Sequence, residues 1–384
     1  MNTHMNPRLS ARLVGLISLS FIILLSLPLT AQSQQRFRDY GLSYGIFKTG
    51  PHNAITDVPG VRVGQVTLIE GDDIRTGVTA IIPHSGNIFQ EKVPAAIYIG
   101  NGFGKLAGYS QVKELGNIET PIILTNTLSV ATGMDALIDY TIARNPNVGS
   151  VNGIVGETND GSLNHIQARA VQKAHVLAAL EQAQDGPVAE GNVGAGTGTV
   201  CFGFKGGIGT SSRVLPSRYG SYTVGVLVQS NYGGVLEIAG VPVWKYLDQY
   251  SFRDAVLQDV DGSCMMVVIT DAPLDARNLE RLAKRAMLGL ARTGGIASNG
   301  SGDYVIALSV HKGNLISASS PLYTPTLLHN DDVSPLFEAV IEATAEALWN
   351  SLFVAETMKG YKGREIKELP VETILPYLRQ LQPR

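Results

Sequence analysis

The order of apolar and polar positions along the chain predicts an alternation of strands and helices. Runs rich in β-branched residues, bounded by Gly, Pro and Asn turns, predict strands over residues 61–69, 78–84, 95–100, 121–127, 150–157, 222–229, 263–270 and 304–310. Apolar residues at helical spacing predict helices over residues 134–144 with Thr132 as N-cap, 163–183, 276–292, and 334–355 with Ser334 as N-cap. This grouping suits an α/β protein in which stacked sheets are covered by helices.

Two stretches interrupt the pattern. Residues 191–213 hold eight glycines, but they lack the spacing of a dinucleotide fingerprint and contain no Gly-Lys-Ser/Thr phosphate loop. We interpret them as a tightly packed strand and turn. From Gly233 to Gly262 the periodicity fades into mixed polar sequence. We interpret this second stretch as a linker.

The linker meets a strand at Ser263. The apolar run that this serine opens ends before Asp271-Ala272-Pro273, as expected of a buried strand. Such a serine is either an ordinary first residue of a strand or, if the protein cuts its own Gly262–Ser263 bond, a new N-terminus. An α-amine has a reference pKa of roughly 7.7–8.0. The cut would therefore place a hydroxyl nucleophile and a candidate general base on one residue.

Composition limits the class of protein. The chain has 384 residues, 44% of them hydrophobic, and a formal net charge of −3. This length suffices for one large or two modest domains, and the absence of a Lys/Arg block argues against a nucleic-acid partner. With 42 glycines and only 16% charged residues, the composition favours a compact, turn-rich α/β enzyme.

The N-terminus has the pattern of a secretory signal. Arg8 and Arg12 precede an apolar stretch at 13–29, and small residues follow at Ala31 and Ser33. The alternative is an uncleaved membrane anchor, but the stretch is broken by a proline and falls below the ~20 residues of a spanning helix. We expect residues 1–33 to be removed and 34–384 to form a single catalytic domain. The mature protein is expected to be exported, to the periplasm in a Gram-negative source, without stable membrane insertion.

Cysteine and histidine provide no obvious chemistry. Cys201 and Cys264 both lie in apolar, strand-like contexts, so they are either buried thiols or, after export, a disulfide. On an alternating strand, Cys264 points to the face opposite Ser263 and is assigned to the core. The seven histidines never pair at metal-ligand spacing, so we expect no metal and no cofactor, and a Ser-His-Asp triad is disfavoured.

Two polar clusters are candidates for a site. Ser301 and Asp303 are two residues apart and share a face on an extended backbone, where they could orient and deprotonate a nucleophile. Asn231 follows a predicted strand and could donate its amide to a developing oxyanion. Each cluster is also typical of an ordinary polar turn.

Seven segments, in order along the chain, carry a family resemblance. They are residues 53–61, 75–80, 191–198, 205–213, 229–233, 262–274 and 299–303. Together they resemble the L-aminopeptidase/D-amidase-esterase and β-aminopeptidase family, whose members are self-processing serine peptidases of the N-terminal-nucleophile type. The resemblance extends over nearly the whole mature chain.

The resemblance implies a four-layer αββα sandwich of the N-terminal-nucleophile type. It also implies cleavage between Gly262 and Ser263, into 34–262 (the α subunit) and 263–384 (the β subunit), and a homo-oligomer of such αβ units. Ser263 would be the nucleophile and Asn231 the oxyanion-stabilising amide.

The resemblance also assigns supporting roles. Ser301 and Asp303 would assist the nucleophile. Glu157 would bind the free amino group of a small peptide or amino-acid amide, because a partly buried carboxylate without a fixed cation is costly until an ammonium arrives. Asn159 stands where the family has an aromatic residue, often tyrosine, near the nucleophile. Any role for a phenol at that position is therefore open.

Three functions compete. The first is an exported aminopeptidase or amidase that releases N-terminal α- or β-amino acids from peptides, amides or esters. An acyltransferase on the same fold, like the ornithine acetyltransferases, would use a threonine nucleophile, and no matching Thr junction occurs. A non-catalytic binding relative is supported by Asn159 alone, and the presence of Ser263, Asn231, Ser301 and Asp303 argues against it.

Overall fold

The computed structural model describes residues 35–253 and 262–380. Two mixed β-sheets form its centre. One sheet contains β3 (Glu91–Gly102), β5 (Asn117–Ile118), β10 (Gly207–Val214), β11 (Thr223–Asn231), β12 (Ser263–Thr270), β13 (Gly302–Ser309) and β14 (Ile316–Ser317). The other contains β1 (Arg62–Glu70), β2 (Ile74–Ile82), β4 (Leu106–Ala107), β6 (Ile122–Asn126) and β7 (Ile154–Thr158). The strand orders are β10-β11-β12-β13-β3-β14, with β5 also paired to β3, and β1-β2-β6-β7-β4.

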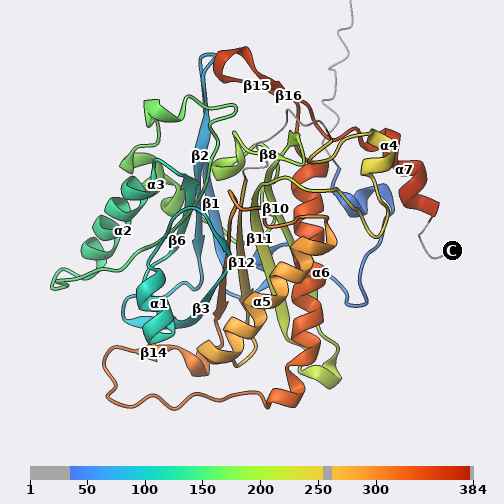
Figure 1. Cartoon of the computed structure of the whole chain (residues 1–384). Coiled ribbons are helices and arrows are strands. Elements are labelled where there is room, and N and C mark those ends of the chain that lie inside the picture. The colour runs from blue at the N-terminus through green and yellow to red at the C-terminus, as the bar shows by residue number, and fades with distance from the viewer. Residues whose placement is uncertain (1–34, 254–261, 381–384) are drawn as a thin grey trace, which may run out of the picture. The chain divides into compact units, whose positions relative to one another are not determined.

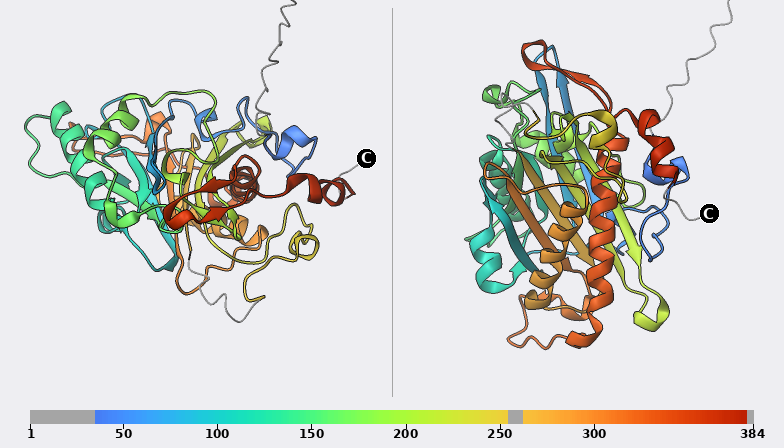
Figure 2. Two further views of the ribbon diagram at one scale, coloured as in Figure 1. Left: turned by 90° about the horizontal axis from the view of Figure 1, so that it is seen from above. Right: turned by 45° about the vertical axis from the view of Figure 1, so that its right-hand side comes forward.

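Helices cover the outer faces of both sheets (Figures 1 and 2). On the five-stranded sheet lie α2 (Val130–Arg144) and α3 (Lys173–Glu181), and on the seven-stranded sheet lie α5 (Ala276–Arg292) and α6 (Ser334–Phe353). The layers therefore follow the order helix, sheet, sheet, helix. The predicted αββα sandwich is confirmed.

Short elements complete the described chain. They are α1 (Tyr109–Leu115), α4 (Trp244–Leu247), α7 (Val371–Gln380), β8 (Val200–Cys201), β9 (Phe204–Lys205), β15 (Met358–Lys359), β16 (Glu365–Ile366), and the 3-10 helices η1 (Phe37–Tyr40), η2 (Ile55–Asp57), η3 (Ile166–Ala168), η4 (Gly194–Gly196), η5 (Ser217–Tyr219), η6 (Lys312–Asn314), η7 (Asn330–Asp332) and η8 (Tyr361–Gly363). The glycine-rich stretch thus forms η4, the short β8–β9 hairpin and β10, so the predicted strand and turn are present together with a hairpin that was not predicted.

The alternation of side chains along β12 supplies two separate cores. Cys264, Met266 and Val268 belong to the apolar cluster under α5 and α6. Met265, Val267 and Ile269 belong to the cluster between the two sheets. Because successive strand residues point to opposite faces, Ser263 shares the face that looks toward the second sheet. The assignment of Cys264 to the core is confirmed.

Helix predictions were accurate where one face packs continuously on a sheet. Helix α5 has the expected bounds, with Leu279 and Leu282 in its buried stripe, and the Asp275 side chain accepts a hydrogen bond from the Asn278 N–H at 2.9 Å. Helix α2 begins at Val130 rather than after Thr132, so the predicted N-cap was wrong.

The helix expected over 163–183 is shorter than predicted. Only α3 is α-helical, because the backbone before it makes other contacts. The His165 N–H donates to the Asp73 carbonyl at 2.8 Å, and Arg169 has a left-handed φ of 49°. A helix cannot continue through such a residue.

The linker interpretation of residues 233–262 was wrong for its first part. Leu236, Ile238, Val241 and Val243 are buried in the core under α5 and α6, and α4 follows them. Turns deliver these apolar side chains at irregular spacing, so no periodicity appears in the sequence. Residues 254–261 lie outside the described part of the chain.

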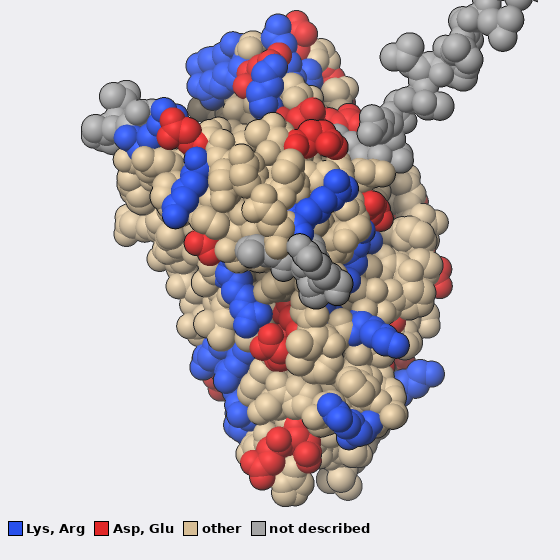
Figure 3. All heavy atoms as spheres, turned by 90° about the vertical axis from the view of Figure 1, so that its right-hand side faces the viewer, with Lys and Arg blue, Asp and Glu red and all other residues tan. Residues whose placement is uncertain are grey.

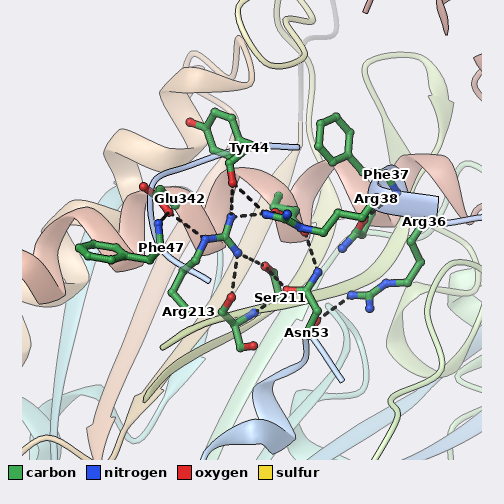
Figure 4. Close-up of polar contacts among 12 residues, drawn as sticks. Arg36, Phe37, Arg38, Tyr44, Phe47, Asn53, Ser211, Arg213 and Glu342 are labelled. Atoms are coloured by element: carbon green, nitrogen blue, oxygen red, sulfur yellow. Dashed lines mark hydrogen bonds and ion pairs between the residues drawn. The ribbon is translucent and has the colours of Figure 1, made fainter. Parts of the chain in front are cut away.

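Buried charges tie the start of the described chain to α6 (Figure 4). The Arg213 side chain, which is fully buried, contacts Glu342 at 2.8 Å and Glu346 at 2.7 Å. Arg38 approaches Glu346 with two nitrogens, each at 2.7 Å. Burial acts to raise the pKa of Glu346, but Arg213 and Arg38 hold it below its ordinary value. Removing Arg213 would leave the buried Glu342 carboxylate without its cation, whereas Glu346 would keep Arg38.

The surface shows mixed charge. On the face seen in Figure 3, basic and acidic side chains are interspersed. Within residues 35–253 and 262–380, no helix has both the length and the apolar character that spanning a membrane requires. The apolar stretch at 13–29, and the predicted signal segment around it, lie outside the described residues.

Candidate active site

A chamber of about 920 Å³ opens between the ends of strands from both sheets. The predicted residues that line it are Ser263, Gly262, Asn231, Glu157 and Asn159. Ser263 and Asn231 come from the seven-stranded sheet, whereas Glu157 comes from β7 of the other sheet. Ser301 and Asp303 are buried behind the wall of the chamber and do not line it.

The Ser263 hydroxyl lies against the peptide bond that precedes it. Its Oγ donates a hydrogen bond to the Gly262 carbonyl oxygen at 2.6 Å. The backbone N–H of Gly302 points at the same place, 3.2 Å from that carbonyl oxygen and 3.3 Å from the Ser263 Oγ. Sequence reasoning missed Gly302, because a backbone donor has no residue-type signal. The arrangement puts a nucleophile beside a carbonyl that an N–H group polarises.

Glycine at position 262 is required by a close approach of two backbones. A Cβ on Gly262 would lie 2.5 Å from the Tyr232 Cα and 2.7 Å from the Asn231 carbonyl oxygen. Real Cβ atoms do not approach other atoms so closely, so a larger residue would push the 262–263 peptide away from β11. The glycine thus keeps the peptide beside Asn231.

Asn231 is the direct neighbour of Ser263 across the antiparallel ladder of β11 and β12. Directly opposed residues have Cβ atoms roughly 4.5–5.5 Å apart and project to the same face. The Asn231 Oδ1 accepts a hydrogen bond from the Val200 N–H at 2.9 Å. This bond fixes the amide plane and leaves the NH₂ end as the donor available on the chamber side.

A buried lysine anchors the glycine-rich segment that carries Val200. The Lys205 Nζ donates to the carbonyl oxygens of Gly196 at 2.9 Å and Gly206 at 2.6 Å. The Gly206 N–H in turn donates to the Thr199 carbonyl at 3.1 Å. Burial lowers the pKa of Lys205 to about 7. Lys205 therefore supports the Asn231 amide indirectly, through the segment from Gly196 to Val200, and sequence reasoning did not single it out.

Asp303 lies on the face of β13 turned away from the chamber. Val305 and Ala307, which share its face of the strand, pack in the core under α5 and α6, and Asp303 pairs with Cys264 in the parallel ladder. Burial raises the pKa of Asp303 to about 6, against the opposing effects of the Ser301 hydroxyl and the Cys264 backbone N–H.

Neither carboxylate oxygen of Asp303, nor the Ser301 Oγ, makes a hydrogen bond of good geometry to another described residue. Buried polar atoms without partners are uncommon in folded proteins. This pair therefore lies beside the backbone at 263–264 with unused hydrogen-bonding capacity.

Replacing Asp303 should stabilise the fold above about pH 6. Burial raises the pKa of Asp303 from 3.8 in the unfolded chain to about 6 in the fold. The fold therefore keeps a proton that the unfolded chain has lost, and it loses stability as pH rises from about 4 through about 6. In a Ser263→Ala background, Asp303→Asn should add roughly 3 kcal/mol to the free energy of unfolding at about pH 8 and less as pH approaches 4. Urea titrations at both pH values would measure the difference. A gain that does not change with pH would contradict the assignment.

Glu157 has a cation beside it, contrary to the expectation from sequence. Its Oε1 accepts a hydrogen bond from the Lys105 backbone N–H at 2.9 Å, and the Lys105 Nζ lies 3.6 Å from the same oxygen. The Lys105 side chain is 55% exposed, whereas that of Glu157 is buried. Gly104 permits this approach, since a Cβ there would lie 2.9 Å from the Glu157 Oε1. The carboxylate is thus paired, but with a partner that is largely exposed to solvent.

Asn159 lies exposed at the rim of the chamber. Its Oδ1 accepts a hydrogen bond from the Gly161 N–H at 2.9 Å, which shapes the turn that follows β7. A phenol does approach Glu157, but from another strand. Tyr304 on β13 is buried. Burial raises the pKa of its phenol, and the negative charges of Glu157 and Asp303 raise it further.

The described cysteines are not placed to act as nucleophiles. Cys201 and Cys264 are both buried free thiols. Burial raises the pKa of Cys201 to about 12 and also raises that of Cys264, so neither would be a thiolate near neutral pH. Among the residues that the structure describes, no cluster of three His, Cys, Asp or Glu side chains could hold a metal ion.

The layered fold is a variant of the Ntn hydrolase fold, as in a solved serine aminopeptidase. A serine at the start of a strand that reaches the chamber fits that class of enzyme. The chain belongs to Peptidase family S58, and the sequence model of that family matches residues 53–366. The family resemblance drawn from the sequence is confirmed. The protein is therefore an enzyme of the aminopeptidase class.

Individual relatives agree with this assignment. A beta-peptidyl aminopeptidase, BapA, of Sphingosinicella microcystinivorans is 40% identical over 356 residues, which cover 87% of this chain and 89% of the relative. Among solved structures, a Burkholderia sp. beta-aminopeptidase is 41% identical with a TM-score of 0.81, covering 91% of this chain and 100% of its own.

The L-aminopeptidase D-Ala-esterase/amidase of Ochrobactrum anthropi, a prototype of the serine aminopeptidases, is 35% identical with a TM-score of 0.82 and covers 90% of this chain and 98% of its own.

Proposed function

We infer that the protein is an exported aminopeptidase that cuts its own Gly262–Ser263 bond and then uses Ser263 to release N-terminal amino acids. One observation carries this proposal: the Ser263 Oγ lies 2.6 Å from the carbonyl oxygen of its own preceding peptide, inside a chamber that also contains Glu157. The direct test is whether purified protein consists of two chains and hydrolyses small amides that have a free amine.

Self-cleavage would begin with addition of the Ser263 oxygen to the Gly262 carbonyl carbon, with loss of the hydroxyl proton. The Gly302 N–H, 3.2 Å from the Gly262 oxygen, would stabilise the resulting oxyanion. Collapse would break the Gly262–Ser263 C–N bond, and the nitrogen would take up a proton. Water would then hydrolyse the ester, leaving a Gly262 carboxylate and a free Ser263 amine.

Ser301 and Asp303 would hold that new amine. They lie beside the Cys264 backbone N–H, one peptide unit from the nitrogen that the cut would release. Their polar atoms have no partner of good geometry among the described residues, and an ammonium would supply the missing donors. This would keep the amine close to the Ser263 hydroxyl, whose proton it would accept as general base.

Substrate hydrolysis would repeat this chemistry on an external amide. Glu157 would bind the substrate ammonium, the Ser263 Oγ would attack the carbonyl carbon, and the Asn231 NH₂ would donate to the oxyanion. The Ser263 ammonium would give its proton to the leaving amine, and water would release the acyl group. The relatives named as beta-aminopeptidases support β-amino acids as the released unit, and the neighbour named as an L-aminopeptidase supports L-amino acids as well.

Asn231→Asp should reduce turnover without unfolding the protein. Aspartate keeps an oxygen that accepts the Val200 N–H but replaces the NH₂ donor, and loss of one such donor costs ~3 kcal/mol, or about a hundredfold to a thousandfold in kcat. Steady-state rates and thermal melts would measure both effects. An unchanged kcat would exclude Asn231 as the oxyanion donor.

Export, the division into domains and assembly belong to the same proposal. Arg36 and Arg38 pair with Glu190 and Glu346, so ion pairs anchor the chain directly after the segment that would be removed. Residues 34–384 would form the catalytic domain, and the αβ units would associate as a homo-oligomer. Mass spectrometry of the secreted protein and light scattering would test these points.

A further inference from the structure

Lys105 occupies the side of the chamber where a substrate's amino terminus would bind. Its Nζ lies 3.6 Å from the Glu157 Oε1 and donates to the Thr127 Oγ1 at 2.7 Å. All three of these residues line the chamber. Thr127 follows β6 and Glu157 is the penultimate residue of β7, so Lys105 reaches across the ends of two neighbouring strands. Its ammonium is thus held beside the carboxylate that would receive the substrate.

Once a substrate ammonium binds in the chamber, the described charged side chains that line it leave one positive charge without a negative partner. Lys105, Glu157 and Arg253 are the charged side chains among the described residues that line it. Arg253 already pairs with Asp248 at 2.7 Å. Lys105 pairs with Glu157, and a substrate ammonium on Glu157 would put two cations beside one carboxylate. Like charges so close repel each other, and a neutral amino acid would bind against that repulsion.

We propose that Lys105 is a specificity-determining residue that selects substrates whose N-terminal residue carries its own carboxylate. The inference rests on the proposed function, because it places the substrate ammonium on Glu157. A carboxylate on the same residue as the ammonium, as in aspartyl or β-aspartyl compounds, reaches the Lys105 ammonium while the amine binds Glu157. The two charges of the substrate then match the two of the enzyme.

The expected effect is moderate, because the Lys105 side chain is 55% exposed and its charge is screened by water. We expect kcat/KM for aspartyl p-nitroanilide to exceed that for the neutral isostere asparaginyl p-nitroanilide by about tenfold. β-Aspartyl and β-alanyl p-nitroanilides give the same comparison for the β linkage. The preference should fall as salt concentration rises.

The test is the acid-to-neutral ratio of kcat/KM in variants. Lys105→Met keeps the backbone N–H that Glu157 accepts and should reduce the ratio to about one, and it should lower KM for neutral substrates. Lys105→Arg should keep most of the preference. Lys113→Met is the matched control, since Lys113 has a similarly exposed side chain but pairs with Glu280 outside the chamber. Its ratio should equal that of the parent.

Two failures are distinguishable. Hydrolysis of neutral substrates with no preference for acidic ones, or a preference that survives in Lys105→Met, would overturn the role of Lys105 and leave the aminopeptidase intact. Failure to hydrolyse any p-nitroanilide with a free amine would instead refute the proposed function and the inference with it.

Discussion

Ser263→Ala is expected to yield one uncut chain without aminopeptidase activity. The substitution removes the oxygen that lies 2.6 Å from the Gly262 carbonyl oxygen, so neither self-cleavage nor acyl transfer can begin. Loss of a nucleophile typically costs roughly 10⁴-fold or more in kcat. The parent protein should instead run as two pieces, about 34–262 and 263–384. Edman sequencing of the smaller piece should begin Ser-Cys-Met-Met.

The adjacent cysteine supplies the control. Cys264 is fully buried in the core under α5 and α6, on the face opposite Ser263. Cys264→Ala should therefore be cut normally and keep substantial activity, with only a modest loss of stability. If the parent protein is fully active as a single intact chain, the N-terminal-nucleophile mechanism is wrong.

Acetylation of the substrate amine is expected to reduce hydrolysis by a few hundredfold or more. Glu157 is buried, and an acetylated substrate would place a neutral amide against its carboxylate in place of an ammonium, leaving the exposed Lys105 as its only cation; losing one partner of such a charge pair typically costs ~3–5 kcal/mol. p-Nitroanilides of small α- or β-amino acids should be cleaved, and their N-acetyl forms should hardly react.

Glu157→Gln should lose most of this activity but still cut itself. Self-cleavage involves no substrate amine, and glutamine keeps an oxygen to accept the Lys105 N–H. Glu119→Gln is a matched control, because Glu119 also pairs with a lysine, Lys92, but does not line the chamber. Its ratio of free to acetylated rates should match the parent. Equal rates on free and acetylated substrates would indicate a general amidase or esterase rather than an aminopeptidase.

Local sequence determined much of the architecture. Strand β12 was predictable because its unbroken apolar run, buried on both faces, extends from Ser263 to Thr270 and ends before Pro273. Helix α5 was predictable because its apolar stripe reports one buried face, and Asp275 caps it. The opposite orientations of Ser263 and Cys264 also follow from the two-residue period of a strand. The segment after Gly233 was misread because its buried residues sit in turns with no period.

Only the tertiary structure decided how the site residues meet. Asn231 lies beside Ser263 because of the register of β11 on β12, and Glu157 faces them because the two sheets stack. The antiparallel pairing of β4 with β7 inside one sheet brings Lys105 to Glu157, a pairing that the sequence could not reveal. These contacts join residues far apart in the chain. Strand register, close backbone approach at Gly104 and Gly262, and the packing of one sheet on another determine them, and none of these leaves a local pattern.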